Sequence, residues 1–143
     1  MARGWASPGE GLPKSTIEQL PNSKVIQFND GDFSVTDLYF VTDHSTASTG
    51  LKTIHFRGDP VWAMHYGGRY ARIAIPFLKE CLRISYKAAR FHGGRGPNFV
   101  RGDRFTYVNQ LEYGSFQDFK GREEIFDFNE DSLGYHWYRG GLL

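Results

Sequence analysis

The stretch Gly31-Asp32-Phe33-Ser34-Val35 decides the fold, because it returns in altered form as Gly102-Asp103-Arg104-Phe105-Thr106-Tyr107. Two further landmarks return as well: Gly50-x-x-x-Ile54 as Gly121-x-x-x-Ile125, and His65-Tyr66-Gly67-Gly68 as Tyr138-Arg139-Gly140-Gly141. The offsets from Phe33 to Phe105, Ile54 to Ile125 and His65 to Tyr138 are 72, 71 and 73 positions. This nearly constant spacing predicts two repeats, residues 24–68 and 99–141.

Alternating apolar and polar side chains predict that both repeats consist of β-strands. We expect seven strands, at residues 24–28, 33–41, 51–56, 61–66, 105–113, 123–128 and 133–138. Asn29-Asp30-Gly31-Asp32 has the composition of a tight turn, so the first two strands are expected to form a hairpin. Near the chain end, Tyr135 and Trp137 are matched with Trp62 and Met64 of the first repeat.

The segment between the repeats has the pattern of an amphipathic helix, from about residue 76 to residue 89. Pro76 fits the first turn of a helix, where its missing N–H removes no hydrogen bond. One side is expected to be buried, with Cys81 at its centre: Phe77, Leu78, Cys81, Leu82, Ile84, Ser85, Ala88 and Ala89. The opposite side is basic.

These elements predict a single α+β domain over residues 1–143. Its expected form is a curved antiparallel sheet of about seven strands in two pseudo-symmetric repeats, with the helix on one face. Residues 1–23 are rich in Pro and Gly and are expected to be extended and partly mobile. Because one helix covers only one face, the other face is expected to be solvated, closed by curvature or used as a pocket.

The composition limits the compartment and the partners. The absence of a long apolar run predicts no membrane span, and the lone Cys81 favours a reducing, cytoplasmic compartment. The formal net charge is +1, but residues 69–104 carry nine Lys or Arg against two acidic residues. The His and Cys residues lack the short spacing of metal ligands, and no glycine-rich nucleotide fingerprint is present, so we expect neither a metal nor a cofactor.

Asp37 is the sharpest local signal, because it lies in an otherwise apolar row of its strand and Asn109 takes the equivalent place in the second repeat. A carboxylate in such a row tends towards a raised pKa unless a donor faces it, which is how both catalytic acids and polar anchors are made. The alternative is a strand-edge Asp that points into water. His65 and His136 are candidate general bases, with solvent-facing imidazoles as the alternative.

Aromatic side chains are expected to form a cup around Asp37 and Asn109, and a plain apolar core is the alternative. The expected ligand-binding set is Asp37, Tyr39, Trp62, Met64, Tyr66, Tyr107, Asn109, Tyr135 and Trp137. Glu123 matches Lys52 of the first repeat, and a structural ion pair is its expected role.

The stretch Trp62-Ala63-Met64-x-Tyr66-x-Gly68 resembles a bacterial domain family of unknown function that occurs free-standing or C-terminal to Xre-type helix-turn-helix regulators. The resemblance spans residues 24 to 141, through Gly96-Pro97-x-Phe99-x-x-Gly102-Asp103, Phe119-x-Gly121-x-Glu123-x-Ile125 and Tyr138-x-Gly140-Gly141. The regulator context implies an effector-sensing or interaction domain. The sequence departs at Lys52, where the resemblance implies an acidic residue, and a site that needs this carboxylate is therefore in doubt.

We therefore expect a small-molecule, effector-like binding domain with an aromatic pocket between the two halves of the sheet. The alternative is a small cofactor-independent enzyme for proton transfer, isomerisation or cyclisation, in which Asp37 acts with a Tyr or His. Binding of nucleic acid or an acidic partner ranks third, through the basic helix face of Arg72, Lys79, Arg83, Lys87 and Arg90. A homodimer is a further possibility that the sequence leaves undecided.

Overall fold

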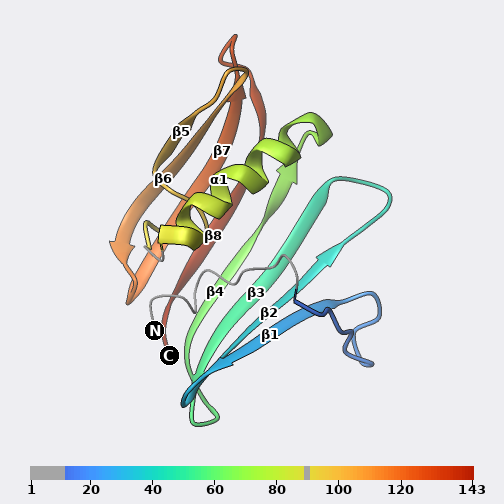
Figure 1. Ribbon diagram of the computed structural model, residues 1–143, viewed down its shortest axis with the longest axis vertical. Coiled ribbons are helices and arrows are strands. Elements are labelled where there is room, and N and C mark those ends of the chain that lie inside the picture. Colours follow the sequence, from blue (N-terminus) through green and yellow to red (C-terminus); the bar gives the residue numbers. More distant parts are fainter. Residues whose placement is uncertain (1–11, 89–90) are drawn as a thin grey trace.

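A computed structural model describes residues 12–88 and 91–143, which form one antiparallel sheet and one α-helix, a mixed α+β architecture (Figure 1). The strands are β1 (Lys24–Asp30), β2 (Phe33–Val41), β3 (Ala47–Phe56), β4 (Asp59–Tyr70), β5 (Phe99–Arg101), β6 (Phe105–Ser115), β7 (Asp118–Asp127) and β8 (Ser132–Leu142). A single 3-10 turn, η1 (Arg72–Ala74), leads into the helix α1 (Ile75–Ala88). No helix in these two ranges is long and apolar enough to cross a membrane.

The strand order is β1-β2-β3-β4-β8-β7-β6-β5, so two sequential halves meet where β4 pairs with β8. The described residues contain eight strands rather than the predicted seven. The strand missing from the prediction is β5, which has three residues and follows a glycine-rich loop. Such a short segment carries no alternation to recognise. Residues 47–50, which lie between two of the predicted strands, are the start of β3.

The two halves share their register. Asp37 pairs with Lys52 between β2 and β3, and Asn109 pairs with Glu123 at the corresponding place between β6 and β7. Asp37 and Asn109 therefore occupy equivalent sites, as predicted. The irregularity after Ile54 between β3 and β4 has its counterpart between Glu124 and Phe126, where β7 pairs with β8. The halves are not exact copies, because β5 is shorter than β1 and β6 has an additional irregularity after Leu111.

The predicted match of Tyr135 with Trp62 is wrong by one residue. Gly50 pairs with Tyr66 and Gly121 pairs with Tyr138, so the counterpart of Tyr66 is Tyr138. These two tyrosines also pair directly with each other between β4 and β8. Because side chains alternate along a strand, the one-residue shift places Tyr135 and Trp137 on the opposite face from Trp62 and Met64.

The helix α1 lies across the β5–β8 half of the sheet (Figure 1). Its start agrees with the prediction within one residue, and Cys81 is buried at the centre of its sheet-facing side, as predicted. Ile84 and Ala88 were predicted to be buried and are exposed instead. Leu78, Leu82 and Ser85 complete the buried side, and the predicted last residue, Ala89, lies outside the described residues.

We call the face that α1 covers the inner face and the opposite face the outer face. The inner face holds the apolar core in two clusters, one beneath α1 and one over the β1–β4 half. In the second cluster the ring of Trp62 stacks on Phe116 and Phe119, and its indole N–H donates to the Phe116 carbonyl at 2.9 Å. Truncating such a buried ring costs about 3–5 kcal/mol.

Candidate functional site

Polar side chains line the middle of the inner face and bind one another. Asp37 accepts a hydrogen bond from the Tyr66 hydroxyl at Oδ1, 2.7 Å away, and its Oδ2 lies 3.6 Å from the ammonium of Lys52. Burial lowers the pKa of Lys52, and the neighbouring Asp37 opposes that shift. The carboxylate therefore has a hydrogen-bond donor at one oxygen and a cation near the other, which is the arrangement of a polar anchor.

Glu123 forms the second buried carboxylate site, at the position equivalent to Lys52. Its Oε1 accepts from the Nε of Arg95 at 3.1 Å and also forms an ion pair with the Arg95 Nη2. Its Oε2 accepts from the Tyr107 hydroxyl at 2.7 Å, and burial together with Glu123 raises the pKa of Tyr107 well above its ordinary value. The expected ion pair of Glu123 is present, and its partner is Arg95.

His136 lies between Arg95 and Ser48. Its Nδ1 is 3.1 Å from Arg95 Nη2, and its Nε2 is 3.2 Å from the Ser48 hydroxyl. An arginine can only donate, so Nδ1 accepts and Nε2 carries the proton. Burial, with the charge of Arg95 as a second cause, lowers the pKa of His136 to about 2. The imidazole is therefore neutral near pH 7 and serves as a packed hydrogen-bonding group.

The loop after α1 closes this polar centre. Asn109 donates to the carbonyl oxygens of Gly93 and Gly96 at 2.8 and 3.1 Å, and it accepts from the Tyr138 hydroxyl at 2.6 Å. A Cβ on Gly96 would overlap the hydroxyl of Tyr107, so only glycine lets the loop lie this close to the sheet. The loop thereby carries Arg95 onto the inner face, where its guanidinium also lies 5.2 Å from the centre of the Tyr66 ring.

The predicted aromatic cup is a packed core. Trp62, Met64 and Tyr107 are at most 1% exposed, and Tyr66 is also buried. Tyr39 is partly buried at the border of the same cluster. None of the three surface hollows described below is lined by these residues or by Asp37. The inner face can thus anchor the helix and the loop, but its polar groups are already engaged with one another.

Two predicted ligand-binding residues lie on the outer face instead. Tyr135 is 41% exposed and Trp137 is 45% exposed, and His65, a predicted general base, is exposed on the same face of β4. Because His65 and His136 lie on opposite faces, they do not act in one site. The structure therefore divides the predicted set into a buried inner group and an exposed outer group.

Trp137 separates two hollows on the outer face. One has a volume of about 630 Å³ and is bordered by His65 and Arg139, and the other has a volume of about 460 Å³ and is bordered by Arg69 and Tyr135. Gly67 pairs with Trp137 across β4 and β8, and a Cβ there would lie 3.1 Å from the indole ring. The glycine leaves room for the ring to pack against the sheet, and Trp137 borders a hollow on each side.

Basic side chains surround the rings of Trp137 and Tyr135. The guanidinium of Arg122 lies 3.9 Å from the centre of the Tyr135 ring and 3.0 Å from the carboxylate of Glu124. Arg69, Lys120 and Arg139 are exposed around it. Aromatic faces and cations arranged in this way suit a flat ligand that carries a negative charge.

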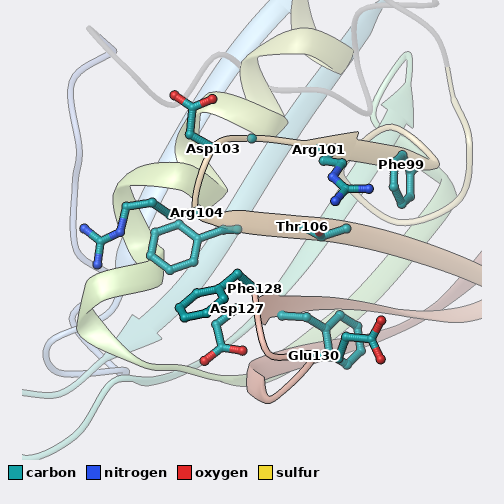
Figure 2. A pocket seen from close by; sticks show the side chains of 11 residues that line it. Phe99, Arg101, Asp103, Arg104, Thr106, Asp127, Phe128 and Glu130 are labelled. Carbon is teal, nitrogen blue, oxygen red and sulfur yellow. The ribbon is translucent and has the colours of Figure 1, made fainter.

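A third hollow, of about 530 Å³, lies where β5 and β7 end and β6 begins (Figure 2). It is bordered by Phe99, Arg101, Arg104 and Phe128 and by the acidic residues Asp103, Asp127 and Glu130. Phe128 is 82% exposed. Because this hollow has both basic and acidic side chains at its border, it has no preference for an anion.

Sequence reasoning missed Arg95 as a residue of the inner face. The available signal was a single arginine beside three glycines and one proline in His92-Gly93-Gly94-Arg95-Gly96-Pro97. Within residues 12–88 and 91–143, no group of three or more His, Cys, Asp or Glu side chains could hold a metal ion.

Comparison with known proteins adds a family but no activity. No curated protein and no solved structure matches the chain. A family model does match, over residues 37–143, which include β3, β4, α1 and all of the second half. The chain therefore belongs to the family described as Domain of unknown function (DUF5680).

Proposed function

We propose that this chain is a binding domain that holds a planar small molecule on the outer face of its sheet, against Trp137. The observation that supports it is the indole ring of Trp137, 45% exposed and lying over Gly67 between two hollows. A large aromatic side chain left exposed at a concave surface is typical of a ligand-binding site. The proposal keeps the expected function and moves its site from the inner to the outer face.

The resemblance to the C-terminal domains of Xre-type regulators suggests that the ligand is an effector. In that role, binding would be reported to a partner or to a neighbouring domain. Ligand affinity, rather than turnover, is then the property to measure.

The proposal is tested by a thermal-shift screen of metabolites and aromatic amphiphiles, followed by titration of each hit against two variants. Trp137→Ala removes the proposed stacking surface. Tyr113→Ala is the matched control, because Tyr113 is 43% exposed on β6 and borders none of the three hollows. We expect about a five- to tenfold loss of affinity for Trp137→Ala, from a stacking contribution of about 1 kcal/mol, and no loss for the control. Equal affinities of both variants and the wild type would refute the site.

The enzyme alternative, with Asp37 as acid or base, stays a prediction. The contacts of Asp37 with Tyr66 and Lys52 account for its position without catalysis. An activity that depends on Asp37 would require a substrate to displace one of these partners. A ligand-bound structure with Asp37 still held by both would remove this alternative.

We also infer that the two halves descend from one duplicated unit. Their shared register, with Asp37 and Asn109 each accepting a hydrogen bond from a central tyrosine, supports this inference. A near-twofold rotation should then superpose Val35 on Tyr107 and Ile54 on Ile125. A rotation that leaves these pairs far apart would contradict it.

A further inference from the structure

The outer face arranges its side chains in rows across β4, β8 and β7. One row contains His65, Arg139 and Lys120, the next contains Gly67, Trp137 and Arg122, and the third contains Arg69, Tyr135 and Glu124. Neighbouring strands lie about 4.8 Å apart, so each aromatic ring has a basic side chain about one strand away. A ligand that lies on Trp137 therefore meets cations on both sides.

The charge of this block is positive. It contains Arg69, Lys120, Arg122 and Arg139. Its acidic neighbours are Glu124 and Glu112, which pair with Arg122 and Lys120 at 3.0 Å, and Asp118, which borders the larger hollow. The buried charges of the inner face balance one another, since Lys52 and Arg95 lie against Asp37 and Glu123. The outer face therefore keeps a positive excess from Arg69 and Arg139, which attracts anions, and the exposed side of α1 carries a second basic surface.

Exposed aromatic and basic side chains recur at the sheet edge, where Phe99 and Arg101 border the third hollow beside its acidic residues. The row of Tyr135 and Glu124 extends through Val108 to Phe99, and Thr106 of β6 pairs with Arg101 of β5. Phe99 is 58% exposed. From β8 to β5 the pattern covers three strand spacings, about 14 Å. This length exceeds what a single ring needs and suits a chain of ring-bearing, anionic units.

Single-stranded nucleic acid has this chemistry. Each unit offers a flat base that stacks on an aromatic side chain and a phosphate that arginine binds through two donors. Open antiparallel sheets with exposed aromatic residues are a known platform for such strands. An acidic peptide would use the cations but not the rings.

We propose that the outer face of β4, β8, β7, β6 and β5 binds single-stranded nucleic acid, with Trp137 stacked on a base and Arg69 and Arg139 on flanking phosphates. This inference rests on the proposed function, because both use the Trp137 surface. The two sources of the shared chemistry, a free nucleotide and a strand, are separated by the test.

The test is fluorescence anisotropy with a labelled oligonucleotide of about ten nucleotides, with AMP, adenosine and a DNA duplex as competitors. The strand should compete best, AMP more weakly, and adenosine most weakly. If three to four phosphates are neutralised, the logarithm of the affinity should fall with the logarithm of salt concentration with a slope of about −2 to −3. Trp137→Ala should weaken binding about five- to 150-fold with little change in this slope.

Two matched triple variants locate the site. Arg69→Ala/Lys120→Ala/Arg139→Ala removes three positive charges from the outer face, and Lys79→Ala/Arg83→Ala/Lys87→Ala removes three from the exposed side of α1. We expect the first variant to flatten the salt slope by about 2 and the second to leave it unchanged. Circular dichroism confirms that each variant is folded.

The outcomes separate the two proposals. If adenosine binds as tightly as AMP and the strand, and Trp137→Ala weakens all three, the planar-ligand site stands and the nucleic-acid inference falls. If AMP binds as tightly as the strand, the strand is not the ligand. If the α1 variant loses as much binding as the outer-face variant, the surface is wrong. If Trp137→Ala changes the binding of no ligand, both proposals fail.

Discussion

Replacing Glu123 by Gln tests whether the buried Arg95–Glu123 pair holds the loop after α1 on the sheet. The Glu123 side chain is fully buried and that of Arg95 is 15% exposed. In Glu123→Gln the amide oxygen can still accept from Tyr107 or from Arg95, but its NH₂ group must face one of these two donors. The charge of Arg95 then has no counter-charge at its side.

The expected cost is large. Removing one partner of a buried ion pair costs about 3–5 kcal/mol, because the other charge stays desolvated. For a chain of 143 residues the entropy of unfolding near the midpoint is about 0.3 kcal/mol per degree. The midpoint of thermal unfolding should therefore fall by about 10–17 °C.

The adjacent carboxylate provides the control. Glu124 lies on the outer face, and its ion pair with Arg122 is partly exposed. Such a pair contributes less than about 1 kcal/mol, so Glu124→Gln should lower the midpoint by at most about 3 °C. The assay is thermal unfolding followed by circular dichroism, with urea unfolding of the same proteins as an independent measure of the free energy.

A double variant decides the cause. Arg95→Met/Glu123→Leu removes both charges of this pair, and replacing a buried ion pair by apolar side chains is often neutral or stabilising. We expect the double variant to be more stable than Glu123→Gln. The reasoning fails if Glu123→Gln is no worse than Glu124→Gln, or if the double variant is less stable than the single one.

Two titratable groups give further predictions. The pKa of His136 is about 2 in the folded chain and 6.5 ordinarily, so below pH 6.5 the unfolded state binds a proton that the folded state does not. The stability from this group is present above pH 6.5 and falls by roughly 2 kcal/mol between pH 7 and pH 5, and the stability difference between wild type and His136→Asn in urea unfolding should shrink accordingly. A difference that is constant with pH would contradict this. Burial raises the pKa of Cys81 from 9.0 to about 12, with smaller contributions from Glu80 and Glu123, so the single thiol should react slowly with a disulfide reagent at pH 8 and rapidly in urea. Equal rates would mean that the sheet-facing side of α1 is open.

The family assignment is consistent with the sequence reading at a coarse level. The resemblance to a domain of unknown function agrees with the matched family over residues 37–143. A family without a known activity leaves the function to be argued from the site. The proposed binding site lies on the outer face of the sheet, whereas the predicted site lay around Asp37 on the inner face. Two residues at the proposed site, Tyr135 and Trp137, were in the predicted ligand-binding set. The neighbouring basic residues Arg69 and Arg139 were not.

The sequence by itself determined the features that depend on neighbouring residues. Alternation predicted the strands, the 3.6-residue period predicted α1 with Cys81 buried, and the turn residues around Gly31 predicted the first hairpin, where this glycine has a positive φ. The constant spacing of landmarks also placed Asp37 and Asn109 at equivalent sites. These signals are local, or they are copies of a local signal.

Only the tertiary structure decided which residues face each other across the sheet. The Gly-Gly match aligned Tyr138 with His65, whereas the pairing of β4 with β8 aligns it with Tyr66. In a strand a shift of one residue exchanges the two faces, so this pairing alone moved Trp137 from the core to the surface. Arg95 reaches Glu123 because a loop folds back over strands that are distant in sequence. Such contacts depend on the packing of the whole sheet, and no short stretch of sequence contains them.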